Sequence, residues 1–70
     1  MDTERTAAIR SRLEEIAEEL DDIGQACLRE AISRQSAPAA ADERLIGRAR
    51  RAVLKAAGLL GGANADQEGD

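Results

Sequence analysis

Four basic residues share one side of a predicted helix and are the strongest candidates in this chain for contact with a ligand. They recur every three or four residues, which at about 100° per residue places them in a single row. We call them the basic row: Arg44, Arg48, Arg51 and Lys55. Guanidinium and ammonium groups bind phosphate oxygens, so this row, together with the adjacent Arg50, predicts candidate phosphate contacts for a nucleic-acid-associated regulator.

An intramolecular role competes for the same basic row. If the chain folds back near Pro38, Glu30 falls opposite Arg44 and Glu19 falls opposite Lys55. Charge complementarity between two helices then accounts for the row, although exposed pairs of this kind contribute only about 0.2–1 kcal/mol each. We prefer this interpretation to nucleic-acid binding, because the chain has no aromatic residue for base stacking and no recognisable helix-turn-helix.

Other chemistry-bearing residues give weaker signals. Six acidic residues lie between positions 14 and 22, but they point around a helix, whereas hard cations need oxygens that converge. Cys27 has no histidine anywhere in the chain to activate it, so we expect a small buried hydrophobic residue rather than a nucleophile. The sequence therefore predicts no enzyme activity, no metal site and no cofactor.

The first element that must position these residues is a long amphipathic helix over residues 3–35. Its apolar residues recur at alternating steps of four and three, which is the spacing of one helix face and is typical of a coiled coil. This stripe consists of Ile9, Leu13, Ile16, Leu20, Ile23 and Cys27. The acidic residues occupy the opposite face, so the stripe is the side that needs a partner surface.

A second helix is predicted over about 42–60, after a connection at 36–41 that contains Pro38. Because proline also suits the first turn of a helix, a start near Pro38 remains open. The apolar stripe of this helix is rich in alanine and consists of Leu45, Ala49, Ala52, Val53, Ala56, Leu59 and Leu60. Residues 1–60 are thus predicted to form an all-α antiparallel hairpin, followed by a disordered acidic tail at 61–70.

A hairpin of this size and composition has too little core to be stable alone. The chain has 70 residues and contains no Phe, Tyr or Trp, and domains this small rarely gain more than about 3–5 kcal/mol from one core. The longer first helix is also expected to overhang the second beyond Ile16. We therefore predict a four-helix-bundle homodimer, or a complex with another helical protein. The predicted interface residues are Ile9, Leu13, Ile16 and Leu54.

Three segments carry a resemblance to a known group of proteins. IAEELDDI at 16–23, LREA at 28–31 and ARRAVLKA at 49–56 resemble short uncharacterised helical-hairpin proteins of actinobacteria. The resemblance implies a cytoplasmic helical hairpin from a high-GC bacterium and carries no activity.

A cytoplasmic location without membrane contact is also expected from the sequence itself. The net charge is −4, and we find neither a signal peptide nor an apolar run near 18 residues. The function predicted from the sequence is a non-enzymatic interaction or adaptor protein that docks through an amphipathic helix face.

Overall fold

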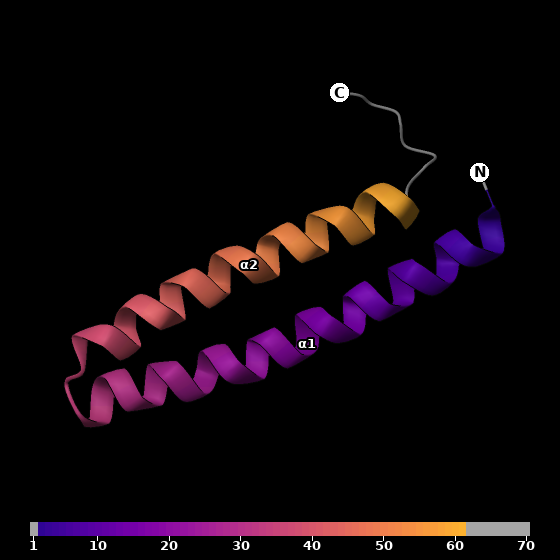
Figure 1. Cartoon of the computed structure of the whole chain (residues 1–70). Helices are drawn as coiled ribbons and strands as arrows, with labels where there is room; N and C mark the ends of the chain where they lie inside the picture. The colour runs from indigo at the N-terminus through magenta and orange to yellow at the C-terminus, as the bar shows by residue number, and fades with distance from the viewer. Residues whose placement is uncertain (1, 62–70) are drawn as a thin grey trace.

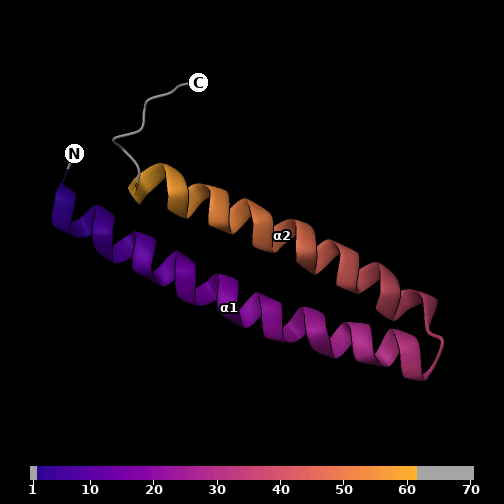
Figure 2. The ribbon, with the colours of Figure 1, turned by 180° about the vertical axis from the view of Figure 1, so that it is seen from behind.

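The computed structural model describes residues 2–61, which form two antiparallel α-helices (Figure 1). α1 spans Thr3–Ser33 and α2 spans Ala37–Gly61. The helices lie side by side over the length of α2, and α1 extends past the end of α2 in both views (Figure 2). The predicted all-α hairpin is therefore confirmed. Of the predicted tail at 61–70, Gly61 is the last residue of α2 and 62–70 lie outside the described residues.

Both helices begin with a side-chain cap. At α1 the Asp2 carboxylate accepts a hydrogen bond from the Arg5 N–H, with 3.1 Å between Oδ1 and N. At α2 the Ser36 hydroxyl accepts a hydrogen bond from the Ala39 N–H, also at 3.1 Å. Each cap satisfies a backbone donor that has no partner inside its helix. The cap at Ser36 fixes the start of α2 at Ala37.

The connection between the helices is residues 34–36, shorter and earlier than the predicted 36–41. Gln35 adopts a left-handed conformation with φ of 49°, and the Ser36 N–H donates to the Ala31 carbonyl at 3.1 Å. This bond across the left-handed residue is the pattern of a Schellman helix end. Pro38 lies in the first turn of α2, where its missing N–H costs no hydrogen bond. The predicted start at 42 is therefore wrong, and the alternative near Pro38 is the better one.

The seam between the helices has the alternating three- and four-residue spacing of an antiparallel coiled coil. On α1 the covered positions are Thr6, Arg10, Leu13, Ala17, Leu20, Gly24, Cys27 and Ala31. On α2 they are Ala39, Glu43, Ile46, Arg50, Val53, Ala57 and Leu60. Only alanines are buried among the described residues: Ala17 and Ala57 are 2% and 3% exposed, and Ala39 is 8% exposed. The alanine methyl groups are therefore the most deeply buried part of the seam, and its larger aliphatic side chains are half-buried.

Two contacts fix the register of the seam. Asp21 lies opposite Arg50 in the middle, and Gly61 lies against the Arg10 side chain at the open end. The end of α2 therefore reaches Arg10, well past Ile16. Leu13 is half-buried in the seam and does not overhang, contrary to prediction. The overhang is shorter because the tight connection lets α2 start at Ala37 and run for 25 residues.

Candidate interaction face

The apolar stripes of the two helices are rotated away from the seam that joins them. At 100° per residue, the stripe of α1 is centred about 45° from the centre of the seam, and that of α2 about 90° from it. The rotation leaves Ile16 and Ile23 of α1 exposed, and likewise Leu45 and Leu59 of α2. The most deeply buried residues of the seam are thus alanines, while several large aliphatic side chains outside it are exposed to solvent.

Both rotations are toward the same side of the hairpin. In an antiparallel pair, positions turned in the same sense from the seam lie on one face. Residues rotated in the other sense from the seam show the same relation. Gln25 and Leu28 of α1 line one hollow together with Gly47 and Arg51 of α2. The displaced stripes therefore meet on the other side of the molecule.

We call this side the apolar face. It comprises Ile9, Ile16 and Ile23 of α1, and Leu45, Ala49, Ala52, Ala56 and Leu59 of α2. Its five large side chains are between 42% and 69% exposed. Single exposed leucines are ordinary, but a set that spans two helices is typical of an interaction surface.

The predicted interface residues divide among three places. Ile9 and Ile16 are exposed on the apolar face, whereas Leu13 is in the seam. Leu54 is on the opposite side of the hairpin, as are the exposed Leu28 and Ile32. Sequence reasoning missed Leu45 and Leu59 as surface residues, because it assigned them to the intramolecular stripe.

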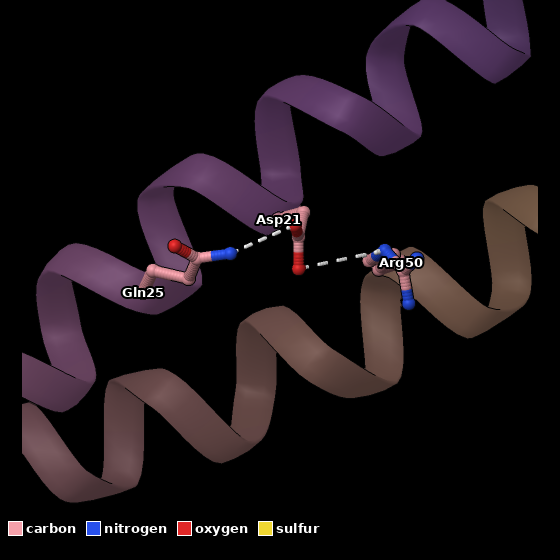
Figure 3. A network of polar contacts seen from close by, with 3 residues as sticks. All are labelled: Asp21, Gln25 and Arg50. Carbon is pink, nitrogen blue, oxygen red and sulfur yellow. Dashed lines mark hydrogen bonds and ion pairs between the residues drawn. The ribbon is translucent and has the colours of Figure 1, made fainter.

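The side opposite the apolar face carries an ion pair between the helices and a hydrogen bond within α1. Arg50 Nε lies 3.9 Å from Asp21 Oδ1, and Gln25 Nε2 donates to Asp21 Oδ2 at 3.0 Å (Figure 3). The Arg50 and Asp21 side chains are 42% and 48% exposed, so water screens the pair and its contribution to stability is small. An open hollow of about 310 Å³ lies here, between Gly24 and Gly47.

The basic row does not pair with α1. Its four residues are exposed and, at 100° per residue, start on the side of α2 away from the seam, from which Arg51 borders the hollow. Within residues 2–61 the one ion pair is Arg50 with Asp21, so the predicted pairs of Glu30 with Arg44 and Glu19 with Lys55 are wrong. Their failure has the same cause as the exposed leucines, since α2 is turned by about 90° from the predicted orientation. Arg50 itself lies in the seam, apart from the row.

The remaining candidates have structural surroundings only. Cys27 is half-buried in the seam, less covered than predicted. In the described part of the chain, no three His, Cys, Asp or Glu side chains are grouped so that they could hold a metal ion. Neither α1 nor α2 combines the length and apolar character that crossing a membrane requires. No protein-family model, curated protein or solved structure matches this chain.

Proposed function

We propose that this protein is a small, non-enzymatic protein–protein interaction or adaptor protein that docks through its apolar face. The docked partner is a pair of helices, supplied by a second copy in a homodimeric four-helix bundle or by another helical protein. One observation carries the proposal: isoleucines and leucines of the apolar face are exposed while the seam fully buries only alanines. Removing aliphatic surface from water is the main driving force for association, and here most of that surface is still available.

The proposed setting is the cytoplasm of a bacterium. The composition and the resemblance to actinobacterial hairpin proteins support it, and the docking needs no cofactor. The partner is expected to carry an apolar helix face of similar length, because the exposed side chains extend from Ile9 to Ile23 along α1 and from Leu45 to Leu59 along α2. Another pair of helices can contact such a face through apolar side chains at helical spacing.

A matched pair of substitutions tests the docking. Ile16→Lys places a charge in the middle of the apolar face, and Ile32→Lys places the same charge at an exposed isoleucine on the opposite side. Lysine suits the acidic surroundings of α1, so neither change should unfold the helix. Mass is measured by sedimentation from low micromolar concentration upward, and the thermal midpoint is followed over the same range.

Wild type and Ile32→Lys should associate with a midpoint that rises with concentration, whereas Ile16→Lys should stay monomeric at the same concentrations. Equal masses for the two variants would contradict docking through this face. If wild type is itself monomeric, the heterologous form is tested by capture from a bacterial lysate. Equal capture by the two variants would then contradict the proposal.

A second function has one observation in its favour, namely that the basic row faces away from α1 and makes no ion pair within residues 2–61. Four phosphate contacts predict that affinity for duplex DNA falls by about 150-fold between 50 and 200 mM salt. Fluorescence anisotropy with a labelled duplex and a labelled RNA measures this slope. Undetectable binding at 50 mM salt would remove the nucleic-acid function.

A further inference from the structure

The direction of the apolar stripes indicates what covers the apolar face. In an isolated pair of helices, both stripes would point at the seam. In a square bundle of four helices each stripe points between two neighbours, about 45° from either one. The stripe of α1 is turned by about this angle and that of α2 by about 90°, both toward the same side. Each helix thus has a second neighbour position on the apolar face.

Side-chain sizes on this face are complementary between the helices. α1 presents isoleucines every seven residues, and the middle of α2 presents alanines. Because Asp21 lies opposite Arg50, Ile16 is level with position 55, between Ala52 and Ala56. A second copy whose α2 lies at the same level offers Ile16 the space between these two alanines. Pairing α1 with α1 would instead place isoleucines along one side of the bundle and alanines along the other.

The charges of the helices favour the same arrangement. α1 carries eight acidic residues and four arginines, whereas α2 carries five basic residues and two acidic ones. Two α1 helices side by side would be two net-acidic neighbours, while α1 beside α2 of the other copy gives neighbours of opposite net charge. Charge of this kind specifies which helices become neighbours more than it adds affinity.

We infer that a second copy of this chain covers the apolar face, with the two-fold axis parallel to the helices. α1 of each copy then lies against α2 of its partner, every neighbouring pair is antiparallel, and both connections at 34–36 lie at the same end of the dimer. The inference rests on the proposed function and deepens it, since it names the partner and its orientation. The two-fold axis makes the contact isologous, as closed dimers require.

Spin labels at two ends of α1 test the orientation. Ser33→Cys lies beside the connection and Ser11→Cys toward the open end, and both are exposed. Each is introduced with Cys27→Ala into the full chain, labelled, and measured by pulsed dipolar spectroscopy at concentrations where the mass is that of a dimer. Circular dichroism and thermal midpoints that match those of Cys27→Ala alone show that the labels leave the fold intact.

The inferred dimer keeps the two α1 helices parallel across the bundle, so both sites should give similar distances of about 25–35 Å. A dimer with its connections at opposite ends would give about 45–50 Å at position 33 and a much shorter distance at position 11. That result would overturn the inferred orientation while leaving docking through the apolar face intact. A monomeric mass at every concentration, with no dipolar signal, would overturn the second copy as the partner.

Discussion

Replacing Gly58 with alanine should raise the free energy of unfolding by about 1 kcal/mol. Gly58 is inside α2, and a Cβ built there meets nothing within 4 Å. The substitution therefore gains the difference in helix propensity between alanine and glycine, about 0.8–1 kcal/mol, without steric cost. For a domain of this size, a change of that magnitude raises the thermal midpoint by about 4–8 °C.

Gly24 provides the comparison within the seam. A Cβ there would lie 3.4 Å from Ile46 Cγ2, which is the near limit of ordinary van der Waals contact. The same propensity gain should result, within about 0.5 kcal/mol of the gain at Gly58. At Gly61 a Cβ would lie 2.5 Å from Arg10 Cδ and Nη1, so Gly61→Ala should give no gain because the arginine must move.

The assay is urea and thermal unfolding followed by helical circular dichroism, with all variants at one protein concentration because association adds to apparent stability. A loss of more than about 1 kcal/mol for Gly24→Ala would show that Ile46 lies closer to Gly24 than the 3.4 Å between a Cβ built there and Ile46 Cγ2 implies. No gain for Gly58→Ala would show that this part of α2 is not helical in solution.

Three further outcomes are expected. Gln35→Gly should stabilise the chain by about 1 kcal/mol, because glycine adopts the left-handed conformation at φ of 49° without steric cost; a loss of stability in urea unfolding would contradict this turn. A double-mutant cycle of Asp21→Asn and Arg50→Gln should give a coupling below about 0.5 kcal/mol, since both side chains are substantially exposed and 3.9 Å apart; coupling above 1 kcal/mol would show a tighter pair. Cys27 should react with a thiol reagent more slowly in the native protein than in urea, and equal rates would contradict its position in the seam.

The sequence predicts the two helices and their antiparallel order well, because both depend on local signals. The periodic apolar residues define α1 from its beginning, and the cap at Asp2 is visible as an acidic residue before the first turn. Ser36 was the missed signal at the connection. Ser36 before Ala37 and Pro38 is a helix cap, but a segment at 36–41 with Pro38 and no large apolar residue favours a loop.

Which side of each helix faces the other could not be predicted from periodicity alone. The stripe of α1 is wide enough to accept a seam centred on Ile16 or on Ala17, and in the structure Ala17 is buried while Ile16 is exposed. On α2 the same choice turns the basic row outward and buries Ala57. An apolar stripe that packs against two neighbouring helices has the same sequence pattern as a stripe that packs against one.

A seam in which only alanines are buried among the described residues also has a calorimetric consequence. The heat-capacity change of unfolding grows with the apolar area that becomes exposed, and averages about 12–15 cal/mol/K per residue in ordinary domains. A hairpin in which Ala17, Ala39 and Ala57 are the only buried hydrophobic residues among those described exposes little new apolar area when it unfolds as a monomer. For the monomer, the heat-capacity increment and the sensitivity to urea should both be below average, so its stability should change little with temperature. Increments near the average would instead report that the isoleucines and leucines outside the seam are covered in the native state.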